Sequence, residues 1–377
     1  MDFAAMRLAA GGNPERMREI LQLEMRHKHA AKLSDTLRCE AFEFPDSLSG
    51  EQSTSDELAE IHASLIEPGE RVLDMTCGLG IDTFHIARKA ASVTACELKS
   101  HVAEAAERNA AALGLDNVTI VNADSVEWLR KHPGSFDTIF IDPARRSADG
   151  GRVYALADCQ PDVVALLPLL RAHCSRLIVK ASPMLDIKKT MSELDNDADI
   201  ILLGNTSECK ELMAILPGNG TISAVTAGAG RMSYTAAEEQ AATPVYGLPA
   251  VGNILYEPYP AVMKSGAMKL LAVRHGLTKT APDTHLYSGA PVADFPGRAY
   301  TVEAVVPFDK RGIKAIAAAA KAGAEVAVRN MGGITAAELR TRLKVKEASD
   351  ARIYGVRSLD GKRHLILCSK PGVSASR

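Results

Sequence analysis

Short apolar runs alternate with amphipathic stretches along the middle of the chain. The apolar runs have the length of buried strands, and the stretches between them repeat apolar residues at the spacing of helices. The predicted strands are RVLDM at 71–75, SVTACE at 92–97, NVTIVNA at 117–123, FDTIFID at 136–142, RLIVKA at 176–181 and ADIILLG at 198–204. Their alternation with helices is typical of a doubly wound α/β sheet.

The two ends of the central region carry other patterns. Residues 1–50 predict a helical extension, because apolar positions such as Ile20 and Met25 recur among charged residues. The segment GTISAVTAGAG at 220–230 is expected to end the central sheet, and the stretch around 226–243, rich in small residues, is expected to contain a domain boundary.

The last part of the chain has the pattern of a small α+β module. From Arg298 the predicted order is strand, helix, strand, helix, strand, turn and strand, with Asp360-Gly361 as the hairpin turn. Such an order places helices on one face of a sheet. Before this module, residues 252–277 predict a strand followed by a helix.

Composition narrows the class of protein. Hydrophobic residues make up 46% and charged residues 24% of the chain, which is typical of a folded globular protein and excludes a disordered or fibrous one. The seven cysteines include no Cys-x-x-Cys pair, which indicates reduced thiols. The chain has neither the pattern of an export signal nor an apolar run long enough to span a membrane, so we expect a cytoplasmic protein without membrane contact.

The formal net charge of −2 conceals an asymmetry along the chain. Residues 1–230 carry 23 Lys and Arg against 34 Asp and Glu, a net charge of −11, whereas residues 231–377 carry 21 against 12, a net charge of +9. A basic part joined to an acidic part is typical of an attached nucleic-acid-binding module. Chance surface charge would give the same balance, so this alternative stays open.

The first predicted strand of the sheet runs into a glycine-rich turn, DMTCGLGIDT at 74–83. Gly78 and Gly80 allow the backbone to approach a ligand closely where a strand turns into a helix. The dinucleotide-binding fingerprint would require a further glycine where Thr83 stands, so a nicotinamide cofactor is disfavoured.

Acidic residues end the next two predicted strands. Glu97 follows Asp74 by 23 residues, and its carboxylate can accept hydrogen bonds from both hydroxyls of a ribose. Asp124 ends the third strand, where a carboxylate can lie beside an adenine amine. Each acid alone has a simpler explanation, because Asp and Glu often stabilise the first turn of a helix. Three acids at successive strand ends favour a nucleoside-containing cofactor.

The fourth predicted strand leads into Asp142-Pro143-Ala144-Arg145-Arg146. We expect this segment to be the acceptor site, which binds the molecule that accepts a transferred group. Transfer of a small group to an amine needs a carboxylate and a backbone carbonyl that orient the amine, and no covalent nucleophile. Arg145 and Arg146 can contact a phosphate or stack on a base, and either can instead cap a helix or pair with an acid.

The sequence also bears on three other kinds of site: a base for a ribose hydroxyl, a cysteine nucleophile and a metal site. Asp142, Lys180 and Glu208 end or follow neighbouring strands and would form a site that deprotonates a ribose hydroxyl, although Lys180 is equally compatible with a salt-bridged strand end. Attack on a pyrimidine carbon would need a cysteine such as Cys159, for which a buried and inert role is the better explanation. The ten histidines have no metal-binding spacing, so no metal is predicted.

With these residues assembled, the chain resembles the class I S-adenosylmethionine-dependent methyltransferases, and more narrowly a bacterial methyltransferase-like family with a THUMP-like C-terminal domain. The narrower resemblance covers most of the chain. It rests on EQSTSDELA at 51–59, LDMTCGLGIDT at 73–83, IDPARRSADGGRVY at 141–154, ECKEL at 208–212, LYEP at 255–258 and VRN at 328–330.

The resemblance implies a Rossmann-like sheet, S-adenosyl-L-methionine as the cofactor, and RNA as the partner of the basic C-terminal part. The expected domains are an N-terminal helical region at 1–50, the cofactor-binding domain at 51–230, a ferredoxin-like domain at 237–290 and a THUMP-like domain at 297–372. The residues expected to bind the cofactor are Gln52, Asp74, Thr76, Cys77, Gly78, Gly80, Asp82, Thr83, Glu97 and Asp124. The expected catalytic residues are Asp142, Pro143, Arg145 and Lys180.

The sequence therefore predicts an enzyme that methylates ribosomal or transfer RNA, on a base amine in preference to a ribose 2′-hydroxyl. Amine methyltransferases of this kind often have Asp-Pro-Pro followed by an aromatic residue, whereas Ala144 and Arg145 stand at the last two positions here. Two alternatives stay open: an RNA-binding or assembly protein with this fold and little or no activity, and a small-molecule methyltransferase.

Overall fold

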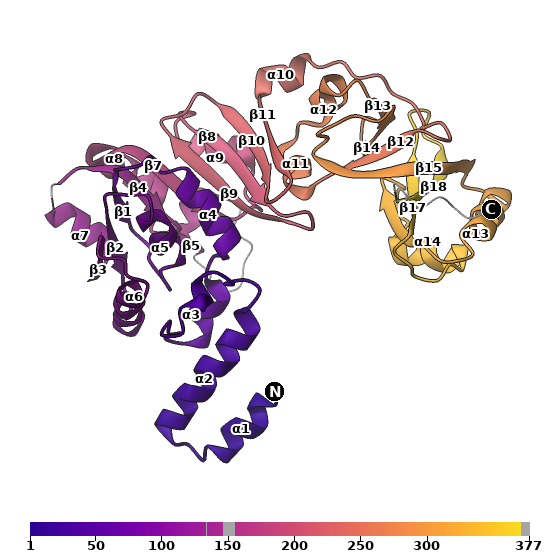
Figure 1. Ribbon diagram of the computed structural model, residues 1–377. Coiled ribbons are helices and arrows are strands. Elements are labelled where there is room, and N and C mark those ends of the chain that lie inside the picture. The colour runs from indigo at the N-terminus through magenta and orange to yellow at the C-terminus, as the bar shows by residue number, and fades with distance from the viewer. Residues whose placement is uncertain (133, 146–154, 371–377) are drawn as a thin grey trace. The chain divides into compact units, whose positions relative to one another are not determined.

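The computed structural model describes residues 1–132, 134–145 and 155–370, and it separates into two compact units (Figure 1). Unit 1 consists of residues 1–201 and 211–220, and unit 2 consists of residues 202–210 and 221–377. No helix within the described ranges is both long and apolar enough to cross a membrane.

The chain begins with a helical region, as the apolar spacing predicts. Its elements are α1 (Phe3–Ala9), α2 (Pro14–His29), the 3-10 turn η1 (Thr36–Arg38), α3 (Ser47–Gln52) and α4 (Asp56–Ser64). Side chains cap these helices at their starts: Asn13 accepts a hydrogen bond from the Arg16 N–H, and Ser55 accepts one from the Leu58 N–H. Buried Met25, Phe42 and Phe44 belong to one hydrophobic cluster that also includes residues of the sheet domain.

Unit 1 is built around a mostly parallel sheet. Its strands are β1 (Arg71–Asp74), β2 (Ser92–Glu97), β3 (Val118–Asn122), β4 (Phe136–Ile141), β7 (Cys174–Ala181) and β9 (Cys209–Leu216), in the spatial order β9-β7-β4-β1-β2-β3. Strand β9 runs antiparallel to β7, and the other pairs are parallel. Five of these strands match the sequence prediction, whereas β9 corresponds to no predicted strand.

The helices of unit 1 alternate with these strands. They are α5 (Ile81–Ala87), α6 (Ser100–Ala112), α7 (Ser125–Lys131), α8 (Val163–His173) and α9 (Ile187–Glu193). Three short elements follow β4, namely β5 (Ala144–Arg145), the 3-10 turn η2 (Leu156–Asp158) and β6 (Cys159–Gln160). Strand β8 (Asp199–Gly204) contains the boundary between the two units. The loops after β1, β2 and β4 all lie at the carboxyl edge of the parallel strands, where such sheets bind ligands.

Unit 2 begins with a hairpin and continues into a second sheet. Its elements are β10 (Thr221–Thr226), β11 (Gly230–Thr235), α10 (Ala236–Ala241), β12 (Ile254–Pro258), α11 (Pro260–Ser265), α12 (Met268–Arg274), β13 (Thr278–Ala281), β14 (Thr284–Gly289), β15 (Gly297–Pro307), α13 (Lys310–Ala319), β16 (Glu325–Arg329), α14 (Ala336–Leu343), β17 (Ala351–Arg357) and β18 (Arg363–Ser369). The predicted turn at Asp360-Gly361 closes the β17–β18 hairpin, where the Ser358 N–H donates to the Lys362 carbonyl.

The second sheet joins the two regions expected to be separate modules. Its order is β13-β14-β12-β15-β18-β17-β16, so β15 pairs with β12 on one side and with β18 on the other. Helices α13 and α14 cover one face of the strands β15 to β18 through a cluster that includes Ile316, Leu339 and Leu365. The predicted arrangement of helices on one face is therefore present, and one continuous sheet carries it.

A buried carboxylate links the two halves of this sheet. Glu257 on β12 pairs with the guanidinium of Arg329 on β16 and lies 3.4 Å from Nη2 of Arg352 on β17. The hydroxyl of Tyr354 donates to its Oε2 atom at 3.0 Å. The Glu257 side chain is 7% exposed, so these partners replace the water that its charge has lost.

We expect Glu257→Gln to destabilise unit 2 by about 3 kcal/mol, because it leaves two arginines beside a neutral amide in a desolvated site. Glu325→Gln is the matched control, since Glu325 pairs with the same Arg352 but is 43% exposed, and should cost less than about 1 kcal/mol. Hydrogen exchange of peptides from β16 and β17 in urea measures both. Equal losses of protection in the two variants would contradict the role of Glu257.

Candidate functional site

Hydrogen bonds to the buried carboxylate of Asp74 fix the glycine-rich turn between β1 and α5. This buried carboxylate accepts hydrogen bonds from the Thr76 N–H at 2.9 Å and from the Thr83 hydroxyl at 2.6 Å. Burial raises the pKa of Asp74 to about 7, and the two hydrogen bonds oppose that rise. Asp74 and Thr83 thus shape the loop from inside and have almost no exposed surface.

The two glycines of this turn serve different purposes. Gly80 has a φ of +92°, and a Cβ there would collide with the Phe84 ring at 2.3 Å, so packing requires glycine. Gly78 has a φ of +55°, and a Cβ there would meet no atom within 4 Å. Gly78 therefore borders open space, whereas Gly80 and the buried Cys77 are part of the loop's support.

The predicted acids of the second and third strands lie beyond this turn. Glu97 accepts hydrogen bonds from the N–H of Gly78 and from the N–H of Lys99, both at 2.9 Å, so it ties the end of β2 to the loop. Asp124 caps α7 by accepting from the N–H groups of Val126 and Glu127, which is the simpler role weighed for it. Gln52 is exposed at the end of α3.

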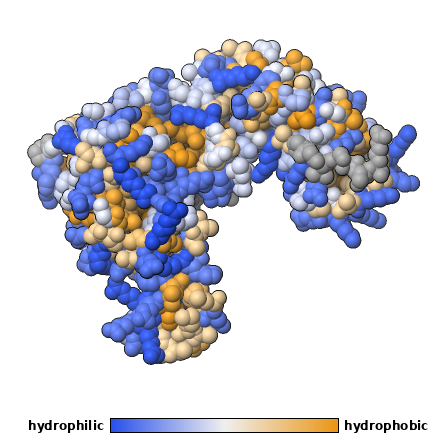
Figure 2. Space-filling model, viewed as in Figure 1, coloured by the Kyte–Doolittle hydropathy of each residue, from blue (hydrophilic) through white to orange (hydrophobic). Residues whose placement is uncertain are grey.

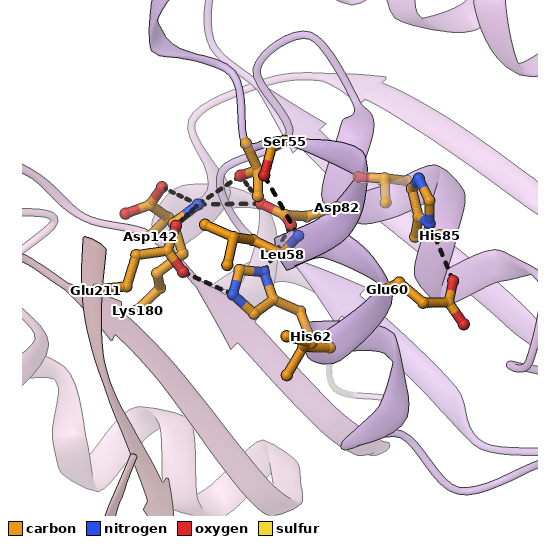
Figure 3. Close-up of polar contacts among 12 residues, drawn as sticks. Ser55, Leu58, Glu60, His62, Asp82, His85, Asp142, Lys180 and Glu211 are labelled. Atoms are coloured by element: carbon orange, nitrogen blue, oxygen red, sulfur yellow. Dashed lines mark hydrogen bonds and ion pairs between the residues drawn. The ribbon is translucent and has the colours of Figure 1, made fainter. Parts of the chain in front are cut away.

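A buried histidine lies beside the acceptor segment. His62 on α4 has no exposed side-chain surface, and its Nδ1 atom lies 2.8 Å from Oδ1 of Asp82. Its Nε2 atom lies 2.7 Å from Oε2 of Glu211 (Figure 3). Burial alone would lower the pKa of His62, but the two carboxylates raise it to about 9. The imidazole is therefore a cation at neutral pH.

Lys180 on β7 joins this histidine to the predicted acceptor site. Its Nζ atom lies 2.9 Å from Oδ2 of Asp142 and 3.1 Å from Oδ2 of Asp82. It also donates to the Thr54 hydroxyl at 2.7 Å, and Glu211 lies 3.9 Å away. Figure 3 shows these side chains converging from different elements. We call Thr54, His62, Asp82, Asp142, Lys180 and Glu211 the buried charge network.

The protonation of this network follows from its contacts. Burial by itself would lower the pKa of Lys180, but Asp142, Asp82 and Glu211 raise it well above its usual value. Burial likewise opposes ionisation of Asp82, yet Lys180 and His62 hold its pKa far below the usual range. Desolvation raises the pKa of Asp142, against the opposing charge of Lys180. Lys180 is thus a hydrogen-bond donor and not a base.

Asp142 is the member of the network that reaches solvent. Its side chain is 40% exposed, whereas those of Lys180, Asp82 and Glu211 are 10–12% exposed. Its backbone N–H donates to the Thr76 hydroxyl at 2.7 Å, which ties the acceptor segment to the glycine-rich turn. The structure therefore brings together the predicted loop and the predicted acceptor segment, with one carboxylate at their junction.

Comparisons with known proteins match each part of the chain. A methyltransferase-domain model matches residues 72–151, a ferredoxin-like domain model matches residues 255–296, and a THUMP domain-like model matches residues 297–370. A crystal structure of a protein from Porphyromonas gingivalis W83, described as a methyltransferase, is 30% identical with a TM-score of 0.85, over 94% of this chain and 90% of that chain. The chain belongs to the class I S-adenosylmethionine-dependent methyltransferases with a THUMP-like C-terminal domain.

Curated relatives agree with this family. An uncharacterised S-adenosylmethionine-dependent methyltransferase of Mycobacterium tuberculosis is 29% identical over 74% of this chain and 75% of its own length. A methyltransferase of Alkalilimnicola ehrlichii, named for carbon-5 of a uracil in 23S ribosomal RNA, is 41% identical over 22% of this chain and 19% of its own length. The predicted fold, enzyme class and cofactor are confirmed.

The other residues predicted for the acceptor site lie close to Asp142 in the sequence or on the segment before β9. Pro143 is buried directly after Asp142, and Arg145 lies on β5, paired with Cys159 on β6. Arg146 lies outside the described residues. Glu208 pairs with Lys210, so the ECKEL segment contributes Glu211 to the network, and not the Glu208 of the sequence hypothesis.

The sequence analysis assigns no role to three members of the buried charge network, namely Thr54, Glu211 and His62. Thr54 and Glu211 lie inside the motifs EQSTSDELA and ECKEL, but no role had been assigned to them. His62 carried a usable signal, because it lies four residues after buried Leu58 on the inner face of α4. A titratable residue on an apolar helix face requires a partner. Asp82 was assigned to the cofactor from its place in the loop motif, and its carboxylate contacts His62, Thr54 and Lys180.

We expect the stability of unit 1 to fall as the pH rises from about 6.5 to about 9. The pKa of His62 is about 9 in the folded protein against about 6.5 when unfolded, so its contribution is complete below pH 6.5 and disappears through pH 9. The loss should approach roughly 3 kcal/mol. Urea midpoints followed by fluorescence of Trp128, on α7 of unit 1, measure it.

His62→Gln should remove most of this pH dependence, because an amide has no proton to lose in that range. His101→Gln is the control, since His101 is 57% exposed and pairs only with Asp46, and it should retain the wild-type dependence. A wild-type midpoint that is constant between pH 6.5 and 9 would show that His62 is not a buried cation.

Proposed function

We propose that this methyltransferase acts on ribosomal or transfer RNA and transfers the methyl group to a base amine. Support for an RNA substrate comes from the THUMP domain-like match at 297–370, the +9 charge of residues 231–377, and short matches to relatives named for methylation of 23S ribosomal RNA. The observation that carries the choice of acceptor is the contact between Asp142 and the protonated Lys180.

The residues around the glycine-rich turn fit S-adenosylmethionine. Gly78 borders open space, and the Glu97 carboxylate at its N–H has further lone pairs with which to accept hydrogen bonds from ribose hydroxyls. Thr76, Asp124 and Gln52 reach the surface and are proposed as further contacts. When bound, the cofactor supplies an activated methyl group on sulfur. Asp74, Cys77, Gly80, Asp82 and Thr83 are proposed to act on it indirectly, by fixing the loop and its helix.

Asp142 is proposed to orient the acceptor amine. Lys180 holds its Oδ2 atom, and the partial exposure of the side chain leaves room for an N–H of the acceptor to donate to the carboxylate. The carbonyl of Pro143 is proposed as a second acceptor, and Arg145 as a contact for a phosphate or base. An amine held in this way presents its lone pair in one direction, which lowers the entropic part of the barrier.

A base amine fits this site better than a ribose hydroxyl does. A hydroxyl is a poor nucleophile unless a base removes its proton, and Lys180 would have to be neutral to serve as that base. Its three carboxylate neighbours keep it protonated. An aromatic amine needs no prior deprotonation and can give its proton to Asp142 after transfer, which the raised pKa of Asp142 favours.

The carbon-5 chemistry named for some relatives has less support in this chain. That reaction needs a thiolate nucleophile. Among the described residues, burial raises the pKa of Cys96 to about 12 and that of Cys77 well above its usual value, and Cys159 is 4% exposed. The Cys77 and Cys96 thiols stay protonated at neutral pH and the Cys159 thiol is shielded from solvent, so attack on a pyrimidine carbon is disfavoured.

We expect Glu97→Gln to weaken S-adenosylmethionine binding by about tenfold to a hundredfold, because a neutral amide loses charge-assisted hydrogen bonds from the ribose. Isothermal titration calorimetry measures the dissociation constant. Glu107→Gln, on the exposed surface of α6, is the matched control and should bind as the wild type does. Equal affinity in Glu97→Gln and Glu107→Gln would remove Glu97 from the cofactor site.

We expect radiolabel from methyl-labelled S-adenosylmethionine to enter RNA when the protein is incubated with separate RNA, protein and small-metabolite fractions of a cell extract. Nucleoside analysis of the labelled RNA should then identify a base methylated on an exocyclic nitrogen. Label confined to small metabolites would refute the RNA substrate, and a 2′-O-methylated ribose would refute the amine acceptor.

In the same assay, we expect Asp142→Asn to lower the rate of transfer by at least about a hundredfold while leaving cofactor affinity unchanged, because the amide cannot take up the proton of the amine. The matched control is Asp116→Asn, at an exposed position between α6 and β3, which should transfer at the wild-type rate. A wild-type rate in Asp142→Asn would exclude Asp142 from the reaction.

A further inference from the structure

Two arginines of unit 2 face each other without a carboxylate between them. Arg357 on β17 and Arg363 on β18 are directly opposite in the antiparallel register. Like charges in this position destabilise a sheet. In the described part of the chain neither guanidinium forms an ion pair with an acid, although six other cations of the same unit do. The pair is therefore not explained by stability.

Both guanidinium groups lie over one exposed loop between β16 and α14. A Cβ on Gly332 would lie 2.6 Å from Nη2 of Arg357 and 3.8 Å from Nη2 of Arg363. Arg363 donates to the Gly332 carbonyl at 3.0 Å, which fixes the position of its side chain. The Nε atom of Arg357 is buried without a hydrogen-bond partner among the described residues. Two positive charges thus converge on a single turn.

The turn itself offers backbone donors at the same place. Gly332 and Gly333 both have left-handed backbones, with φ of +57° and +73°, and both are exposed. Their N–H groups have no acceptor among the described residues. Successive amides in such a turn form a concave site for an anionic oxygen. The turn also follows the carboxyl end of β16, which is parallel to β17, the edge at which parallel strands bind ligands.

The charges around this turn add to its positive potential. The Phe308 N–H donates to the Arg363 carbonyl, so the start of α13 with exposed Lys310 and Arg311 is adjacent. The nearby acids are already engaged: Asp309 caps α13, and Asp360 pairs with Lys362. Hydrophilic residues project along the margin of the region that carries α13 and α14 (Figure 2). Within the described residues, no carboxylate therefore forms an ion pair with either arginine of the pair.

We propose that Arg357, Arg363 and the Gly332-Gly333 turn bind a backbone phosphodiester of RNA. This inference rests on the proposed function, and it gives unit 2 a defined contact with the substrate. A guanidinium fork and backbone amides match the oxygens of a phosphate, and the binding of one anion relieves the repulsion between the arginines. The contact reads no base, so it positions the RNA and leaves sequence selection to other residues.

The test compares two charge-matched double variants of the full-length protein. Arg357→Gln/Arg363→Gln removes the proposed site. Lys321→Gln/Arg342→Gln removes two exposed charges of the same module that form no ion pair with any residue the structure describes. The probe is a fluorescein-labelled oligouridylate without a terminal phosphate. Its dissociation constant is measured by anisotropy over a series of KCl concentrations.

We expect the site variant to bind the probe more weakly and to reduce the slope of log affinity against log salt by about 0.7, the value for one lost phosphate contact on a single strand. The control variant should keep a slope close to that of the wild type. Unchanged S-adenosylmethionine affinity and urea midpoint in both variants establish that the fold is intact. Equal slopes and affinities in the two variants would overturn the proposal.

Three further results decide between this inference and the proposed function, or refute both. If the wild type binds only an oligouridylate that carries a 5′-phosphate, the site takes a terminal phosphate and the backbone proposal is wrong. If the wild type methylates RNA but the site variant binds and methylates like the control, the arginine proposal fails and the RNA substrate stands. If label enters only small metabolites and no probe binds, both proposals fail.

Discussion

The ammonium group of Lys180 lies inside the sheet domain and determines much of what surrounds it. A charge that has lost its water is stable only beside opposite charge, and Asp82, Asp142 and Glu211 supply it. Those carboxylates in turn require a second cation, which is the imidazolium of His62. The position of Asp142, the most exposed member at 40%, thus follows from the compensation of charges that are 10–12% exposed.

Compensation of buried charge also brings together motifs that are far apart in the sequence. EQSTSDELA and ECKEL meet in the buried charge network, through Thr54 and Glu211. LYEP and VRN meet in unit 2, where Glu257 pairs with Arg329. In unit 2 one motif provides the buried charge and the other provides its partner, so neither can change alone without leaving an uncompensated charge. The acceptor residue and the sheet of unit 2 both depend on such pairs.

The periodicity of apolar residues predicts the parallel strands of unit 1. The predicted strand at 92–97, for example, has the same bounds as β2. It also placed Asp74, Glu97 and Asp142 at the ends of parallel strands. Sequence spacing could not indicate which way a side chain turns at a strand end or on a helix. Spacing assigns Asp82 to the cofactor site and selects Glu208 over Glu211. It cannot show that Asp82 pairs with Lys180, 98 residues away, because such pairing depends on tertiary packing. The pairing of Glu211 with His62, 149 residues away, is hidden for the same reason.

The division of charge between the two parts of the chain bears on which atom is methylated. Residues 1–230, which carry the cofactor loop and Asp142, have a net charge of −11, and such a surface repels the phosphates of RNA. A ribose hydroxyl is flanked by two phosphates and brings them with it, whereas a base can be extended away from the backbone. If RNA is the substrate, as proposed, a neutral base would enter the acidic part more readily than a ribose with its two phosphates. Charge and the protonated Lys180 therefore favour the same acceptor, a base amine.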